Sequence, residues 1–128
     1  MSTPDAEKPT GLLLSRDLIF TSKVTGTASA LGHKVVVAGS PASAQANLAK
    51  AAPAVVFVDL SAGDLVSPAA IASYREITPS GTPYVAFGSH VDTQALADAR
   101  AAGCDPVMPR SRFTTELPAL IRRYFGEG

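Results

Sequence analysis

Polar side chains that can do chemistry stand directly after short apolar runs in this sequence. Asp59 ends the run AVVFVD, Ser15 and Arg16 follow GLLL, and Arg110 comes shortly after PVM. A carboxylate next to guanidinium groups forms charge-assisted hydrogen bonds, whereas several neighbouring carboxylates would hold a hard divalent cation. The residues therefore predict an acid with basic partners, provided that the chain brings these loops together.

Other kinds of site lack the residues they need. Cys104 is the single cysteine, so an internal disulfide and a paired-thiolate metal site are excluded, and we expect it to fill a small buried space. His33 and His90 have no second histidine or cysteine nearby in sequence, so we expect no metal site there. No glycine-rich nucleotide motif and no hydrolase triad spacing is present.

Five apolar runs of strand length alternate with longer, alanine-rich stretches. The runs are continuous rather than alternating, which is typical of parallel strands buried on both faces. The pattern predicts an α/β fold with helices on both faces of a parallel sheet. Such sheets carry their functional groups on the loops after the carboxyl ends of the strands. We expect strands at 11–15, 34–38, 54–59, 83–88 and 106–108, and helices at 17–31, 40–51, 68–77, 92–103 and 114–125.

Length and charge limit the classes of function. With 128 residues, we expect one domain over 11–125, preceded by a polar, proline-containing disordered tail over 1–10. The 11 basic and 11 acidic residues cancel, so we expect no nucleic-acid or membrane partner. No stretch reads as a membrane span or a secretory signal, which predicts a cytoplasmic protein.

Three features in register resemble the receiver domain of response regulators, over 11–125. Asp59 ends the third apolar run, the fourth run follows Thr82-Pro83, and Gly103-Cys104-Asp105 precedes the short fifth run. The resemblance implies a three-layer, flavodoxin-like (βα)5 domain with a five-stranded parallel sheet in the order 2-1-3-4-5. It also implies a role in two-component signalling.

The resemblance places Asp59 at the phosphoacceptor position. In active receivers an acidic pair after the first strand holds magnesium, and here Ser15 and Arg16 stand at that pair, with Asp17 one place later. A hydroxyl and a guanidinium cannot replace two anionic ligands, so we expect weak magnesium binding and no cofactor.

The remaining receiver positions also depart from the family pattern. The switch hydroxyl of strand four maps onto Gly88, and only the neighbouring Ser89 could offer an oxygen. The lysine after strand five maps onto Arg110, which keeps the charge but not the ammonium geometry. We further expect the Arg16 guanidinium to take the place of the metal and to pair with Asp59, with Arg110 on the other side.

These features predict an atypical receiver that stands alone, is not an enzyme and acts through protein contacts, with impaired or absent phosphorylation. The family implies a histidine kinase or an effector as partner, and a homodimer through the fourth helix, fifth strand and fifth helix. One alternative is a working receiver phosphorylated on Asp59 with Asp17 as its acidic helper. Another is a flavodoxin-like domain that binds a small ligand in the same loops. The sequence does not identify the pathway.

Overall fold

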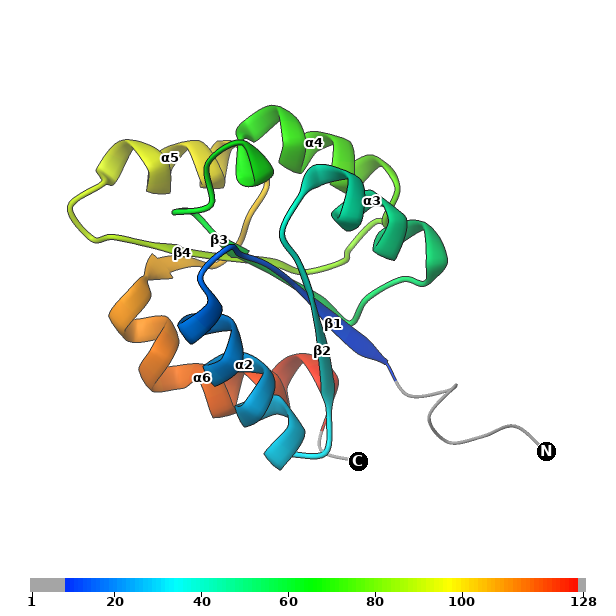
Figure 1. Ribbon diagram of the computed structural model, residues 1–128. Coiled ribbons are helices and arrows are strands. Elements are labelled where there is room, and N and C mark those ends of the chain that lie inside the picture. Colours follow the sequence, from blue (N-terminus) through cyan, green and yellow to red (C-terminus); the bar gives the residue numbers. More distant parts are fainter. Residues whose placement is uncertain (1–8, 127–128) are drawn as a thin grey trace.

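The computed structural model describes residues 9–126, in which strands and helices alternate along the chain (Figure 1). Of the tail predicted over 1–10, residues 1–8 lie outside the described residues. Thr10 belongs to the first strand rather than to a tail. In chain order the elements are β1 (Thr10–Leu14), α2 (Leu18–Ala30), β2 (Lys34–Ala38), α3 (Pro41–Lys50), β3 (Val55–Asp59), η1 (Gly63–Val66), α4 (Pro68–Glu76), β4 (Tyr84–Gly88), α5 (Thr93–Ala101), β5 (Val107–Pro109) and α6 (Arg110–Phe125).

The strands form one parallel sheet in the order β2-β1-β3-β4-β5, which confirms the predicted α/β flavodoxin-like topology. Leu14 lies opposite Val58, and Asp59 lies opposite Phe87, so the carboxyl ends of the three inner strands meet at one edge. The loops that follow β1, β3, β4 and β5 therefore converge around Asp59.

Helices cover both faces of the sheet: α2 and α6 lie on one face, and α3, α4 and α5 on the other (Figure 1). Alternate residues of the strands enter two separate cores, because successive side chains of a strand point to opposite faces. Within β3, Phe57 packs under α2 and α6, whereas Val56 and Val58 pack under the other three helices.

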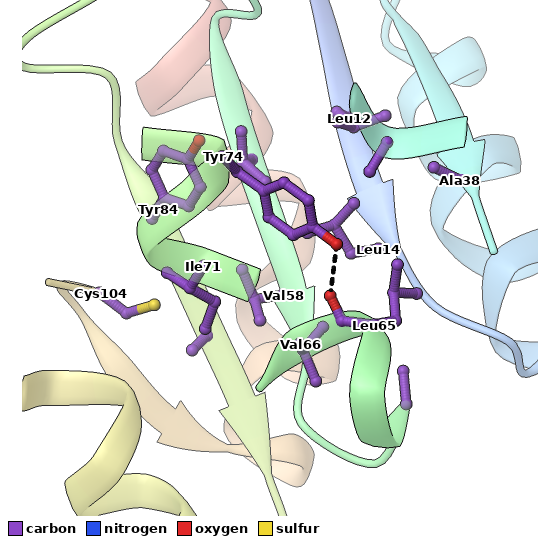
Figure 2. Packing of buried hydrophobic residues seen from close by; sticks show 14 of the residues in the cluster. Leu12, Leu14, Ala38, Val58, Leu65, Val66, Ile71, Tyr74, Tyr84 and Cys104 are labelled. Atoms are coloured by element: carbon purple, nitrogen blue, oxygen red, sulfur yellow. Dashed lines mark hydrogen bonds between the residues drawn. The ribbon is translucent and has the colours of Figure 1, made fainter. Parts of the chain in front are cut away.

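The core beneath α4 contains buried hydroxyl groups, each of which has a partner. The Tyr74 hydroxyl donates a hydrogen bond of 2.7 Å to the Leu65 carbonyl, which joins α4 to η1 (Figure 2). Thr78 Oγ1 and Tyr84 Oη lie 3.1 Å apart within the same core. Burial raises the pKa of both tyrosine hydroxyls, so they stay protonated.

The final helix begins earlier than predicted. We expected a helix from residue 114, but α6 starts at Arg110 directly after β5, because buried Phe113 anchors its first turn to the sheet. At its other end, the Phe125 ring covers Gly11 of β1, where an added Cβ would lie 2.8 Å from Phe125 Cζ. The short helix η1 was not predicted. Within residues 9–126, no helix is both long and apolar enough to cross a bilayer.

Candidate functional site

Asp59 ends β3 with its side chain fully buried, and four hydrogen bonds reach its two carboxylate oxygens. Oδ2 accepts from Ser15 Oγ at 2.7 Å. Oδ1 accepts from the Ser61 backbone N–H at 3.0 Å, from Ser61 Oγ at 2.7 Å and from Arg110 Nη2 at 2.7 Å. A buried carboxylate without partners would cost several kcal/mol, so these donors allow the charge to remain in the interior.

Arg110 supplies the positive charge that faces Asp59, as predicted. Its side chain is 32% exposed, and the same Nη2 atom donates to Ser61 Oγ at 3.0 Å. The guanidinium carbon lies 4.7 Å from the centre of the Phe20 ring and 5.4 Å from that of Phe87. A planar guanidinium can stack on aromatic rings while it donates to a carboxylate, which a lysine ammonium cannot do in the same way.

Ser15 and Asp17 take part in the start of α2 rather than in an acidic cluster. Ser15 is buried, and its Oγ both donates to Asp59 and accepts from the Asp17 N–H at 3.2 Å. Asp17 is the N-cap of α2, with Oδ1 accepting from the Phe20 N–H at 3.0 Å. Since a helix N-terminus favours an anionic cap, Asp17 has a complete structural role outside the Asp59 pocket.

Arg16 does not pair with Asp59, so that part of the sequence hypothesis was wrong. Its Nε donates to the Gly39 carbonyl at 2.8 Å, and its Nη1 donates to the Ala62 carbonyl at 3.0 Å and to Asp64 Oδ1 at 2.8 Å. The side chain thus ties the loop after β1 to the loops after β2 and β3. Backbone carbonyls and an exposed carboxylate bind the guanidinium, while the hydroxyls of Ser15 and Ser61 reach Asp59.

The Arg16 guanidinium lowers the pKa of the Asp64 carboxyl, first through the hydrogen bond and then through its charge. Both groups lie near the surface, with side-chain exposures of 44% and 76%. A pair of this kind contributes little to stability by itself. Its structural effect comes from the three contacts that one side chain makes to two loops.

The predicted switch position is occupied by a neighbouring side chain. Gly88 ends β4 and is buried, and an added Cβ there would lie 3.1 Å from Leu60 Cβ and 3.3 Å from Leu60 Cδ1. Ser89 does not supply the missing oxygen, because it is exposed and its Oγ accepts from the Val91 N–H at 3.3 Å. Leu60 therefore fills the space where a serine or threonine at position 88 would stand.

Both carboxylate oxygens of Asp59 accept hydrogen bonds from the protein itself, and Arg110 donates to one of them directly. Within residues 9–126, no three histidine, cysteine, aspartate or glutamate side chains gather in a way that could hold a metal ion. Ser15 and Arg16 offer a hydroxyl and a cation where magnesium needs anionic oxygens, so the residues present do not fit that ion.

Three contributors escaped the sequence analysis. Ser61 bonds Asp59 through its amide and its hydroxyl, a local pattern that an aspartate two residues before a serine favours. Leu60 fills the space beside Gly88, and the glycine at that position was the one signal in sequence that a neighbouring side chain fills it. Asp64 had no signal in sequence, because its contact depends on the direction of the long Arg16 side chain.

The other residues with reactive side chains make none of the hydrogen bonds to Asp59. Cys104 is buried as predicted, and burial raises the pKa of its thiol to about 11. His33 stacks on Phe125 with ring centres 4.8 Å apart, near the start of β2. His90 is exposed on the loop after β4.

Comparison with known proteins identifies the fold. No family model and no curated protein matches the sequence. Among solved structures, the chain is similar to a response regulator from Thermotoga maritima, with 21% identity, a TM-score of 0.75, and coverage of 92% of this chain and 98% of the other.

Two receiver domains show the same likeness. The receiver domain of NtrX from Brucella abortus has 21% identity and a TM-score of 0.77, with 92% of this chain and 99% of the other covered. The receiver domain of the sensor histidine kinase PA1611 from Pseudomonas aeruginosa, with magnesium in its active-site cleft, has 15% identity, a TM-score of 0.76 and coverage of 93% and 98%. The chain therefore has the CheY-like receiver fold of response regulators.

Proposed function

We propose that this chain is an atypical receiver that acts in signal transduction through protein contacts and does not depend on magnesium-assisted phosphorylation. One observation carries the proposal: the buried carboxylate of Asp59 is bonded by Ser15, Ser61 and Arg110 within the protein itself. A phosphoryl acceptor needs a free oxygen and a metal that offsets the incoming negative charge. Both oxygens of Asp59 are already hydrogen-bonded, and Ser15 and Arg16 stand where the anionic ligands of the metal would be.

The surroundings of Asp59 support a single stable conformation. Arg16 binds the loops after β2 and β3, and Leu60 fills the space beside Gly88. A receiver that switches needs two arrangements of these loops with a small difference in free energy. Contacts made by the protein's own side chains favour one arrangement, so we propose that partners bind a constant surface.

The partner surface that the receiver fold suggests is the face of α5, β5 and α6. In this chain α5 exposes alanines and α6 exposes Arg122 and Arg123 near its end. We propose a histidine kinase or an effector as the partner class, or a second copy of the chain through this face, in the cytoplasm. The fold and the receiver resemblance support this choice.

The experiment that tests the proposal is incubation with acetyl phosphate and magnesium, followed by intact-mass and peptide mass spectrometry. We expect no phosphoryl adduct on Asp59 in the wild-type chain. The Ser15→Asp/Arg16→Asp variant restores an acidic pair and serves as the comparison, since it should bind magnesium more tightly. A stable adduct on wild-type Asp59 would instead support the working receiver.

A further inference from the structure

We propose that two copies of this chain associate by inserting the first turn of α2 of one copy into the groove between α4 and α5 of the other. The contact uses the side of α5 that faces α4 and involves neither β5 nor α6, and the proposal does not rest on whether Asp59 is phosphorylated. It follows from two surfaces of the same chain: an exposed apolar projection with a lysine beside it, and a groove that has room for a side chain and carries a carboxylate.

The first surface is an apolar projection on α2. Leu18 and Ile19 are 82% and 87% exposed, the highest values among the large hydrophobic residues of 9–126. They are the first two residues of the helix, about 100° apart around its axis, and Lys23 follows Ile19 by one turn on the same side. Ile19 and Lys23 thus form an apolar and basic projection, with Leu18 exposed next to it. An exposed apolar group of this kind indicates a contact surface.

The second surface is a groove between α4 and α5. Its volume is about 170 Å³, and a closed apolar cavity of about 150 Å³ is known to hold a benzene molecule, so the groove has room for an aliphatic side chain. The groove exists because Ala95 and Ala99 of α5 present only methyl groups towards α4. The lining includes Leu60, Val66, Pro68, Ile71, Ala95 and Asp98.

Charge complementarity selects a second copy as the occupant. Asp98 is the charged member of the groove lining, and its carboxylate makes one hydrogen bond, from Gln94 Nε2 at 2.7 Å. An apolar projection that enters the groove with a cation beside it can pair that cation with Asp98. Ile19 and Lys23 supply this combination on the chain itself. A charge pair at the rim of a contact fixes the register of the two surfaces.

Both surfaces lie on helices that begin at the same edge of the sheet. Helices α2, α4 and α5 all begin at the carboxyl edge of the sheet, with α2 on one face and α4 and α5 on the other (Figure 1). We propose a two-fold arrangement, in which each copy supplies one projection and one groove, so that association stops at a dimer. Leu60 lines the groove directly after Asp59, so the contact also adjoins the buried charge pair.

Sedimentation velocity of the full chain over a wide concentration range tests the proposal. We expect a species of twice 13.1 kDa to form as concentration rises. Lys23→Glu and Asp98→Lys should each weaken association at least about tenfold, because each places like charges together at the contact. The Lys23→Glu/Asp98→Lys double variant should restore it. Lys50→Glu, which alters an exposed lysine of α3, is the matched control and should have no effect.

A mixing experiment distinguishes this contact from any other dimer. Ile19→Asp removes the projection, and Ala95→Phe fills the groove, so neither variant should associate alone. Their mixture should form a dimer with one contact, since one variant keeps the groove and the other keeps the projection. Thermal melting of each variant verifies that the monomer is folded. A sedimenting mass of 13.1 kDa at all concentrations overturns the proposal. So does a dimer whose association is unchanged by Lys23→Glu, Asp98→Lys, Ile19→Asp and Ala95→Phe.

Discussion

Arg110 Nη2 lies 2.7 Å from Oδ1 of Asp59, joining the start of the last helix to the end of a central strand. The two residues are 51 positions apart in sequence. The bond places the receiver-like acid and its basic partner in direct contact, with the Ser61 hydroxyl bonded to both. The predictions below follow from this contact and its neighbours.

Loss of the Arg110 guanidinium should destabilise the fold more than loss of a surface charge. Arg110→Met leaves the buried Asp59 with hydroxyl and amide donors only, and we expect a loss of about 2 to 3 kcal/mol in the free energy of unfolding, less than for a fully buried pair because Arg110 is one-third exposed. Urea unfolding measures the change.

The Asp59→Asn background provides the control for that substitution. There the side chain carries no charge, so Arg110→Met should cost markedly less, and the difference between the two backgrounds gives the coupling energy. Equal costs in both backgrounds would show that packing on Phe20 and Phe87, rather than the charge pair, accounts for the role of Arg110.

A side chain at position 88 should be tolerated only when Leu60 is reduced. Gly88→Thr forces a Cβ to within 3.1 Å of Leu60, and overpacking of this kind costs roughly 1 to 3 kcal/mol. The Leu60→Ala/Gly88→Thr double variant should recover part of that loss relative to Leu60→Ala alone. Thermal or urea unfolding of the four proteins gives the comparison, and strictly additive effects would contradict it.

Removal of the Arg16 side chain should loosen the loop after β3 while the sheet stays intact. Arg16→Met deletes the hydrogen bonds to the Gly39 and Ala62 carbonyls and to Asp64, so amide exchange of residues 62–66 should accelerate. Hydrogen exchange with mass spectrometry measures it. Asp64→Asn, which alters one of the three contacts, should have a smaller effect, and exchange unchanged in Arg16→Met would contradict the role of the clamp.

The Arg16 and Asp64 contact should also depend on pH. The pKa of Asp64 lies below its ordinary value of 3.8, so the unfolded chain takes up this proton first as the pH falls. The stability that this contact contributes is therefore complete above pH 3.8, and it is lost as the pH falls through the lowered pKa of Asp64. The stability difference between the wild type and Asp64→Asn should shrink as the pH is lowered from neutral to below about 4.

Cys104 should be inert in the folded chain and should weaken the fold at high pH. Its thiol is buried with a pKa of about 11, against an ordinary value of 9.0, so the unfolded chain loses this proton first. Stability should fall as the pH rises between these values, and Cys104→Ala should abolish this part of the decline. A thiol reagent at mildly alkaline pH should react only after urea is added, and fast labelling of the native chain would contradict this.

Much of the fold could be predicted because its determinants are local and repeated. The five strands are continuous apolar runs, and the caps Asp17, Ser40 and Asp92 stand where helices begin. The start of α6 could not be read, because Arg110, Ser111 and Arg112 look like a polar loop until Phe113 is seen to be buried. Tertiary packing decides that boundary.

Part of the site could be predicted because it follows from the order of the strands. Topology brings Asp59 and Arg110 to one edge of the sheet, and chain order alone reveals this. The direction of Arg16 could not be predicted, because a long side chain chooses among acceptors that include backbone carbonyls. The acceptors themselves, such as the Gly39 carbonyl, are identical in every sequence and give no signal.

The packing of Phe125 on Gly11 has a consequence for biosynthesis. Gly11 belongs to β1, and the ring that covers it is the last residue of α6, so this face of β1 lacks that cover until residue 125 has left the ribosome. Nascent chains stalled before α6 should therefore remain susceptible to protease throughout, and protection should appear in a single step once that helix emerges from the exit tunnel.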